Sequence, residues 1–227
     1  MARTTRDRPP RRYQDFVIRD GKFIGAFEKM YRTCEDPWDQ DKDEKYYPTR
    51  EIALLLLKQI QCRAILDIGC GTGRFTTNLR AATAAEVTAL DVSDSALGIA
   101  RRRDPKIAFR QAEVPPIPFE EGSFDTVIAS ELLWYIVPHL ESFFSEVERV
   151  LRPDGWLLVI QQFYRRGRQQ YQRGVMTTPS QLMKMLPFDV KQAVSAYNTE
   201  SMDYHSILLC RKRAGKESHV EADGPGR

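Results

Sequence analysis

The sequence of 227 residues lacks a long apolar run, an apolar N-terminal segment and paired cysteines. Its longest aliphatic stretch, residues 52–57, is far shorter than the roughly 20 residues that a membrane-spanning helix needs. The absence of an apolar segment near residue 1 predicts no secretory signal. None of the four cysteines shows the paired spacing of a metal site, which predicts reduced thiols and no metal. We therefore expect a cytoplasmic protein without membrane contact.

A strongly basic fold is also lacking, although the formal net charge is +3. Residues 1–12 hold five arginines and one aspartate, and residues 211–227 hold five basic and three acidic residues. Residues 13–210 therefore carry a net charge of −3, whereas a nucleic-acid groove would place basic residues on the fold itself. We predict no nucleic-acid partner, a disordered basic tail at 1–14 and a disordered tail at 214–227. Weak contact between these tails and acidic partners stays open.

Apolar runs alternate with helical patterns along the rest of the chain. Strands are expected at residues 64–68, 86–91, 107–110, 126–130, 155–161, 190–196 and 204–210. Segments with helical spacing lie between them, and this alternation predicts an α/β domain with a parallel sheet covered on both faces. The chain is long enough for one such domain, which we expect to span residues 48–213.

Polar residues with capping chemistry precede three of the expected helices. Thr72, Ser93 and Thr178 each stand where a helical pattern begins, so each is predicted to cap a helix. In the N-terminal segment, apolar residues recur at helical spacing from Phe23 to Cys34. This spacing predicts an amphipathic helix that stops before Pro37, because the residue before a proline avoids the helical region.

Three glycines follow the first expected strand in the stretch ILDIGCGTGRF. A dinucleotide fold spaces its glycines as G-x-G-x-x-G and holds a pyrophosphate at the helix N-terminus. Here the third glycine comes one residue early, in Gly69-Cys70-Gly71-Thr72-Gly73, and Asp67 would repel a pyrophosphate. The loop therefore favours a phosphate-free nucleoside over NAD. S-adenosylmethionine, with its ammonium and carboxylate, meets these requirements, and Asp67 can favour the ammonium or hold loop amides.

Two further acids stand at the ends of the next two expected strands. Asp91, with Val92 beside it, lies 18 residues after the last loop glycine and is predicted to accept hydrogen bonds from both ribose hydroxyls. Glu113 is predicted to accept from the adenine amino group, with Ala112 and Val114 beside the ring. Each acid alone can equally be a strand-end or capping residue. Three acids at successive strand ends, together with the glycine loop, favour a nucleoside site.

Four stretches carry a resemblance to a known family: ILDIGCGTGRF, VTALDVS, FRQAEVPPIPFEEGSFDTVIASELLWYI and LRPDGWLLV. They resemble the successive motifs of class I S-adenosylmethionine-dependent methyltransferases over about residues 48–163. The resemblance implies a Rossmann-like α/β fold with a seven-stranded sheet, mostly parallel with the last strand antiparallel, and helices on both faces. It also implies S-adenosyl-L-methionine as the cofactor.

Two shorter motifs are similar to a narrower group. DPW ahead of a helix and SELLWYI after the fourth strand resemble the nodulation-factor N-methyltransferase (NodS-like) group. Members of that group methylate an amine on a deacetylated chito-oligosaccharide, so the resemblance implies a saccharide amine as one acceptor class. The polar tails of this chain are longer than those of that group.

The segment after the fourth strand is expected at the carboxyl ends of the strands, where ligands bind in open α/β sheets. Ser130 should flank the sulfonium. Glu131 either positions an amine or hydroxyl, as a catalytic residue, or braces the turn, and Trp134 and Tyr135 either contact the acceptor or belong to the core. His139, the one histidine expected near the strand ends, is a candidate base. The turn lacks the Asp/Asn-Pro-Pro-aromatic pattern of enzymes that methylate nucleic-acid bases.

A lid is expected at residues 15–47, which hold the amphipathic helix and an acidic stretch, EDPWDQDKDE. The acidic stretch is either a solvated loop or a rim that attracts a cationic acceptor. Trp38 is predicted to close over the cofactor, and Arg50 to pair with the methionine carboxylate. Tyr46 and Tyr47 are predicted to line the acceptor pocket.

The leading functional prediction is methyl transfer to a nitrogen or oxygen of a small molecule or saccharide. The sulfonium is already an activated methyl donor, so the protein chiefly aligns the nucleophile, the methyl group and the sulfur. A base is needed only for a nucleophile that is protonated at neutral pH. The alternative is a domain that binds S-adenosylmethionine and regulates or scaffolds without catalysis. Either function is compatible with a monomer or a homodimer.

Overall fold

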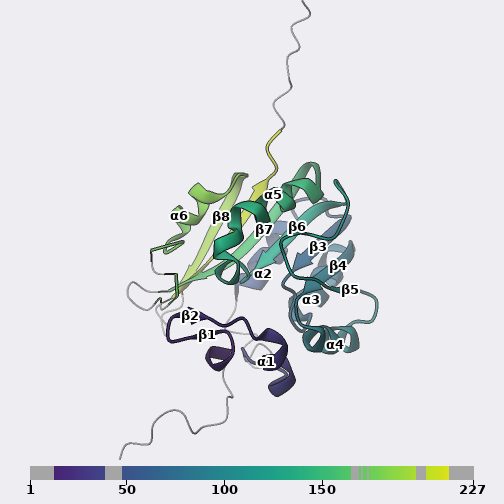
Figure 1. Cartoon of the computed structure of the whole chain (residues 1–227). Helices are drawn as coiled ribbons and strands as arrows, with labels where there is room; N and C mark the ends of the chain where they lie inside the picture. Colours follow the sequence, from purple (N-terminus) through teal and green to yellow (C-terminus); the bar gives the residue numbers. More distant parts are fainter. Residues whose placement is uncertain are drawn as a thin grey trace, which may run out of the picture.

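The computed structural model describes residues 13–38, 48–164, 169, 171–172, 174–197 and 203–214. Most of both predicted tails, residues 39–44 of the acidic stretch, Tyr46 and Tyr47 lie outside these ranges. The described part consists of one large sheet with helices on both of its faces and a small N-terminal layer below it in Figure 1.

The sheet has seven strands in the order β5-β4-β3-β6-β7-β9-β8. β3 pairs in parallel with β4 and β6, and β9 pairs antiparallel with both β7 and β8. This topology confirms the predicted fold, including the antiparallel last strand. The strands are β3 (Ala64–Ile68), β4 (Glu86–Asp91), β5 (Ala108–Gln111), β6 (Phe124–Ser130), β7 (Leu151–Phe163), β8 (Asp189–Tyr197) and β9 (Tyr204–Arg211).

The central strands are apolar because both of their faces are covered. Four of the five residues of β3 are buried, as expected for the middle of a parallel sheet. β7 begins at Leu151, four residues before the predicted start at Gly155. Leu151 already pairs with Phe124 of β6, and a register shift accommodates residues 152–155, which include Pro153 and Gly155, before the pairing resumes at Trp156.

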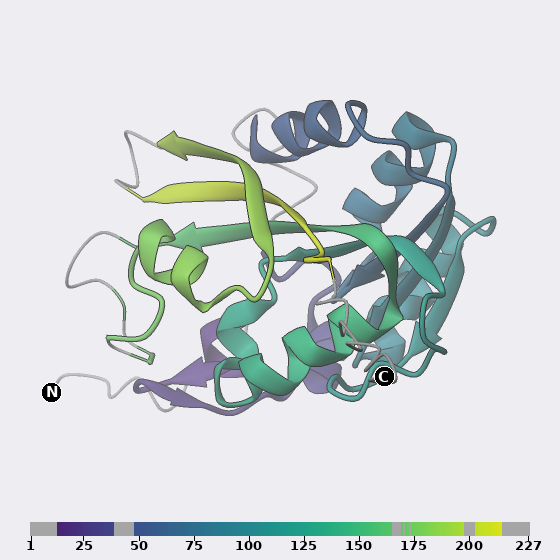
Figure 2. The same cartoon turned by 90° about the horizontal axis from the view of Figure 1, so that it is seen from above.

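Helices cover both faces of the sheet, as Figure 2 shows for α2 (Pro48–Leu57) and α5 (Leu140–Val150). α2 and α3 (Arg74–Thr83) pack into one apolar cluster, and α5 and α6 (Pro179–Met185) pack into the other. α5 is amphipathic, and its buried residues recur three and four positions apart. The two clusters fix the strand ends, and with them the loops that follow each strand.

Two of the three predicted caps are confirmed, and one is wrong. Ser93 Oγ accepts from the amide of Ala96 at the start of α4 (Asp94–Arg103), and Thr178 caps α6 in the same way. Thr72 does not cap α3, because the N-cap position falls on Gly73, which has a φ of +73° and no side chain to accept a hydrogen bond. The glycine loop extends one residue further than the capping pattern suggests.

The N-terminal segment contains a short helix and a small hairpin. η2 (Tyr13–Asp15) includes Tyr13, which the sequence places in the disordered tail, and is followed by β1 (Ile18–Arg19), β2 (Lys22–Phe23) and α1 (Phe27–Thr33). The predicted helix start at Phe23 is therefore wrong. Gly25 has a left-handed φ of +66°, which interrupts the helical pattern and confines Phe23 to the hairpin.

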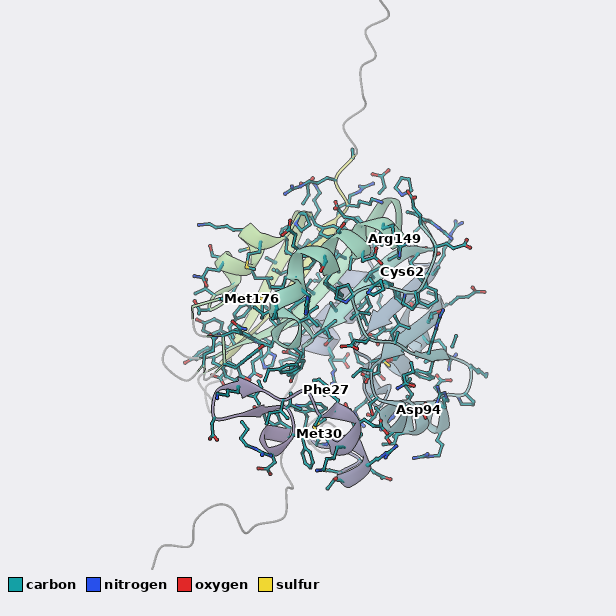
Figure 3. The ribbon with its side chains drawn as sticks, viewed as in Figure 1. Phe27, Met30, Cys62, Asp94, Arg149 and Met176 are labelled. Carbon is teal, nitrogen blue, oxygen red and sulfur yellow. The ribbon has the colours of Figure 1, made fainter. Side chains whose placement is uncertain are left out.

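The N-terminal layer packs on α4 at the edge of the sheet. Met30 and Tyr31 of α1 form a buried cluster with Phe16, Val17 and Ala96, the last of which belongs to α4. Figure 3 shows Phe27 and Met30 in this layer, with Asp94 of α4 to one side.

Glu28 adds a polar contact between the layer and α4. Its carboxylate accepts hydrogen bonds from the hydroxyls of Ser93 and Ser95, both at 2.7 Å, and from the amide of Ser95. These hydrogen bonds are the main reason why the pKa of Glu28 is lowered to about 2. A charged carboxylate therefore ties α1 to the N-terminus of α4.

Within the described residues, none of the helices has both the length and the apolar character needed to cross a membrane.

Candidate active site

A pocket of about 1060 Å³ opens where the strands of the parallel part of the sheet end. The loops after β3, β4, β5 and β6 line it, together with the N-terminal layer and the start of α2. The predicted site residues that it brings together are Trp38, Arg50, Asp67, Gly69, Cys70, Gly71, Asp91, Val92, Ala112, Glu113, Val114, Ser130, Glu131, Trp134, Tyr135 and His139. Gly73 is the described member of the predicted set that does not line it.

Asp67 lies at the end of β3 and is almost fully buried, with 2% of its surface exposed. Its Oδ2 accepts a 2.7 Å hydrogen bond from the hydroxyl of Thr76 in α3. Burial raises the pKa of Asp67 to about 6, although the Thr76 hydrogen bond and the charge of Arg50 oppose this shift. The site therefore holds a carboxylate that an added cation would stabilise.

The glycine loop is held against the end of β4 by backbone hydrogen bonds. The amides of Gly69 and Cys70 both donate to the carbonyl of Leu90, at 2.8 and 2.9 Å. The amide of Gly71 donates to Oδ2 of Asp91 at 2.8 Å, and the amide of Ser93 donates to Oδ1 at 2.9 Å. Asp91 thus connects the glycine loop to the start of α4.

The residues after β5 form the outer side of the same pocket. Ala112 and Val114 are partly buried and pack on the apolar core, and Glu113 between them is exposed. Gln111 donates from its side chain to the carbonyl of Val92, which joins this loop to the one after β4. The predicted adenine-binding and ribose-binding residues are therefore neighbours in space.

Glu131 stands at the turn after β6 in a left-handed conformation, with φ of +55°. Its amide donates to the carbonyl of Ile160, and its Oε2 accepts from the amide of Gln162 at 2.9 Å. Its Oε1 lies 3.0 Å from Nδ1 of His205, which also lines the pocket.

The prediction that His139 is the one histidine near the strand ends is wrong. His139 lines the rim of the pocket and is exposed, whereas the side chain of His205 is 13% exposed and contacts Glu131. His205 lies within an apolar strand sequence, YHSILLC, and no local pattern distinguishes it. Only the placement of β9 beside β7 brings it to the site.

Trp134 and Tyr135 lie in a short 3₁₀ helix, η4 (Leu133–Tyr135). The sequence left open whether these two residues contact the acceptor or belong to the core. Trp134 is 7% exposed in the apolar core, and its ring N–H donates to the carbonyl of Gln162 at 3.0 Å. Both residues also line the pocket. Tyr135 meets Phe27 edge-on, with ring centroids 5.2 Å apart.

The N-terminal layer supplies an aromatic wall. The ring of Trp38 lies 6.2 Å from that of Tyr13 and 5.6 Å from that of Tyr31. The pocket is lined by five aromatic residues of this layer, Tyr13, Phe23, Phe27, Tyr31 and Trp38, and also by Tyr164. Sequence reasoning identified Trp38 in this wall and missed Tyr13.

Within the ranges that the structure describes, no group of three or more His, Cys, Asp or Glu side chains is arranged to hold a metal ion. The donor set instead suits an organic cofactor, because it combines backbone amides, carboxylates and aromatic rings.

Comparisons with known proteins agree with this geometry. Residues 66–159 match a family described as a methyltransferase domain. An uncharacterized methyltransferase of Synechocystis sp. is 41% identical over 92 residues, which cover 40% of this chain and 43% of that protein. A fatty-acid O-methyltransferase of Mycolicibacterium smegmatis is 29% identical over 127 residues, which cover 55% of this chain and 46% of that protein. The chain spans less than half the length of these relatives.

A solved structure extends the likeness to most of the fold. The N-methyltransferase NodS from Bradyrhizobium japonicum WM9, in complex with S-adenosyl-L-homocysteine, superposes with a TM-score of 0.69 at 19% identity. The match covers 82% of this chain and 98% of that one. With the strand order, this likeness shows that the chain shares the fold of that enzyme, and residues 66–159 carry the match to the methyltransferase-domain family.

Proposed function

We propose that the protein transfers the methyl group of S-adenosylmethionine to a nitrogen or oxygen of a small molecule or saccharide. The observation that carries the proposal is the single pocket that runs from Asp91 and the glycine loop to Glu131 and the aromatic wall. A cofactor at the first end and an acceptor at the second would share one enclosed space.

The residues at the first end have the chemistry that the cofactor requires. The two oxygens of Asp91 each accept one backbone N–H, and a carboxylate has lone pairs left for two ribose hydroxyls. Glu113, Ala112 and Val114 would hold the adenine. Asp67 would face the ammonium.

Arg50 would pair with the methionine carboxylate of the cofactor. It stands in the first turn of α2, lines the pocket and lies close enough to Asp67 for its charge to lower the pKa of that acid. Opposite charges on Arg50 and Asp67 match the opposite charges on the cofactor's methionine group.

The second end would hold the acceptor. Aromatic rings from the N-terminal layer and from η4 surround it, and flat faces of rings or sugars pack well against such walls. When bound, the cofactor supplies an activated methyl group, so the chain's own task is to align the nucleophile and exclude water. An N-methyltransferase and a fatty-acid O-methyltransferase among the similar proteins support either nitrogen or oxygen as the acceptor atom.

We further propose that residues 48–213 form the catalytic domain and that residues 15–47 form a lid. The described part of that lid covers the pocket with Tyr31 and Trp38 and is attached to α4 through Glu28. Such an element can complete an acceptor site and exclude water.

The test is a screen for S-adenosylhomocysteine production with S-adenosylmethionine as the donor. Small amines, phenols, fatty acids and amino oligosaccharides would be offered as acceptors, and products would be identified by mass spectrometry. We expect turnover with at least one class, and loss of turnover in Asp91→Ala. Tight binding of S-adenosylhomocysteine without transfer to any acceptor would overturn the proposal in favour of a regulatory or scaffold domain.

A further inference from the structure

A carboxylate and an imidazole meet in the acceptor half of the pocket. Oε1 of Glu131 and Nδ1 of His205 are 3.0 Å apart, and both residues line the same cavity as Asp91. The side chain of His205 is 13% exposed and that of Glu131 is 38% exposed. The pair is therefore sheltered but reachable from the pocket.

Backbone groups hold the carboxylate of this pair in place. His205 lies directly opposite Gln162 in the antiparallel pairing of β7 and β9. The amide of Gln162 donates to Oε2 of Glu131, and the carbonyl of Gln162 accepts from the indole of Trp134. One residue of β7 thus positions both Glu131 and Trp134.

A purely structural brace does not explain the arrangement well. β7 and β9 are already paired without interruption from Trp156↔Arg211 to Phe163↔Tyr204, so their pairing does not require a side-chain link through β6. Glu131 also adopts a left-handed backbone, which is unfavourable for a residue other than glycine. Conformations of this kind concentrate at functional sites.

We propose that His205 is the general base for methyl transfer and that Glu131 is its positioning residue; the inference rests on the proposed function. A carboxylate at Nδ1 favours the tautomer with a proton on Nδ1, which leaves the lone pair on Nε2. Nε2 then takes the proton of the acceptor, and Glu131 stabilises the imidazolium that forms.

Nε2 of His205 removes a proton from an O–H or an N⁺–H group of the acceptor. The lone pair on that oxygen or nitrogen forms a bond to the methyl carbon, while the carbon–sulfur bond breaks and its electrons remain on sulfur. The products are the methylated acceptor, S-adenosylhomocysteine and a protonated His205.

A general base at His205 limits the kinds of acceptor that the site would serve. A base is useful only where the nucleophile carries a proton at neutral pH, as in a phenol, another hydroxyl or an alkylammonium group. A weakly basic nitrogen that is already deprotonated would gain nothing from His205. The pocket thus fits an acceptor with an ionisable hydroxyl or amine on a body that packs against the aromatic wall.

The experiment compares His205→Gln and Glu131→Gln with the wild type on ring-substituted phenols and benzylamines of graded acidity. Ser206→Ala is the matched control, because it removes a 2.9 Å hydrogen bond to Ser195 from the adjacent position of β9, outside the pocket. Calorimetry with S-adenosylhomocysteine reports on the fold and the cofactor site in each variant.

We expect His205→Gln to lower kcat by about 10²-fold or more for protonated acceptors, the usual contribution of a general base, with unchanged affinity for S-adenosylhomocysteine. The loss should shrink for the most acidic phenols, which are already ionised. Added imidazole should restore part of the activity of His205→Ala, and Ser206→Ala should behave as the wild type.

Two results separate the possible failures. Wild-type kcat in His205→Gln, or an equal loss for acidic and non-acidic acceptors, would overturn the assignment of the base and leave the proposed function intact. A wild-type protein that binds S-adenosylhomocysteine but methylates none of these compounds, nor those of the wider screen, would overturn the proposed function itself.

Discussion

The hydroxyl of Thr76 donates a 2.7 Å hydrogen bond to the carboxylate of Asp67, at the point where β3 enters the glycine loop. This single hydrogen bond does not offset the burial of the carboxylate, whose pKa is raised from 3.8 to about 6. The charged form of Asp67 is thus destabilised in the folded protein without cofactor. Arg50 compensates this only in part, so a further cation beside Asp67 would stabilise its charged form.

Asp67→Asn should therefore separate stability from cofactor binding. At pH 7 we expect the free energy of unfolding of the cofactor-free protein to rise, by on the order of 1–3 kcal/mol, because a neutral amide replaces a buried charge and still accepts from Thr76. Affinity for S-adenosylhomocysteine should fall, because the partner of its ammonium is lost. Denaturant unfolding and calorimetry measure the two effects.

Asp104→Asn is the matched control, because Asp104 lies outside the pocket and its pKa is lowered, whereas that of Asp67 is raised. Burial alone would raise the pKa of Asp104, but the 2.7 Å hydrogen bond from Arg80, the hydrogen bond from the amide of Lys106 and the positive charges of both residues together lower it. This substitution should reduce stability at pH 7 and leave cofactor affinity unchanged. An equal loss of stability in both variants would contradict the account of Asp67.

The same shift predicts a pH dependence of opposite sign for folding and for binding. Between about pH 6 and pH 4, folded Asp67 binds a proton that the unfolded chain does not, so its contribution to stability increases as the pH falls. Affinity for S-adenosylhomocysteine should instead weaken as the pH falls through about 6, because Asp67 becomes neutral. Calorimetry of the wild type and Asp67→Asn across this range tests the prediction, since the variant should lack this component of the pH dependence.

Asp91→Ala should weaken cofactor binding strongly. It would remove the acceptor for two ribose hydroxyls, and each hydrogen bond to a charged group contributes about 1.5–3 kcal/mol, or at least about tenfold in affinity. Asp94→Ala is the control, because Asp94 is exposed, pairs with Arg101 at 3.1 Å and does not line the pocket. Calorimetry with S-adenosylhomocysteine should show wild-type affinity for Asp94→Ala only. Retained affinity in a folded Asp91→Ala protein would place the ribose elsewhere.

Gly73→Ala should destabilise the fold, whereas Gly98→Ala should not. A Cβ on Gly73 would lie 2.8 Å from Cβ of Ala100 in α4, and the φ of +73° is unfavourable for alanine. We expect a loss of about 1–3 kcal/mol in the free energy of unfolding, the usual cost of overpacking. A Cβ added to Gly98, within α4, would have Nη1 of Arg102 as its nearest neighbour at 3.9 Å, so alanine there should add about 0.5–1 kcal/mol to the free energy of unfolding. Denaturant unfolding of both variants decides whether Gly73 serves the packing of α3 on α4.

The proposed N-terminal lid should become more ordered when S-adenosylhomocysteine binds. Hydrogen exchange is the suitable measurement, because lid opening is slower than the motions that crystallographic B-factors report. S-adenosylhomocysteine should slow exchange over residues 30–38 more than over the sheet. Trp38→Ala should lose part of this protection, and Trp156→Ala, which alters a tryptophan that does not line the pocket, should keep it. Equal protection with and without cofactor would make this segment a fixed part of the core.

Local sequence patterns were sufficient for the features that depend on neighbouring residues. The apolar run that ends at Asp67, the glycine loop and the acids at the ends of β4 and β5 are all encoded within short segments. In a parallel sheet the carboxyl ends of the strands meet at one edge, so these local signals also predicted which residues share a pocket. The N-terminal helix was placed too early because its apolar spacing continues through Gly25, whose left-handed backbone ends the hairpin.

The sequence alone was sufficient for the α/β class and for the glycine loop that lines the pocket, where we propose that the cofactor binds. Only the tertiary structure decided which residues meet at the proposed acceptor side, where Glu131 contacts His205 across 74 positions of the chain. Nothing near His205 marks it, because its neighbours follow the pattern of an ordinary apolar strand. Its place in the pocket depends on the insertion of β9 between β7 and β8, and that order follows from the packing of the whole sheet.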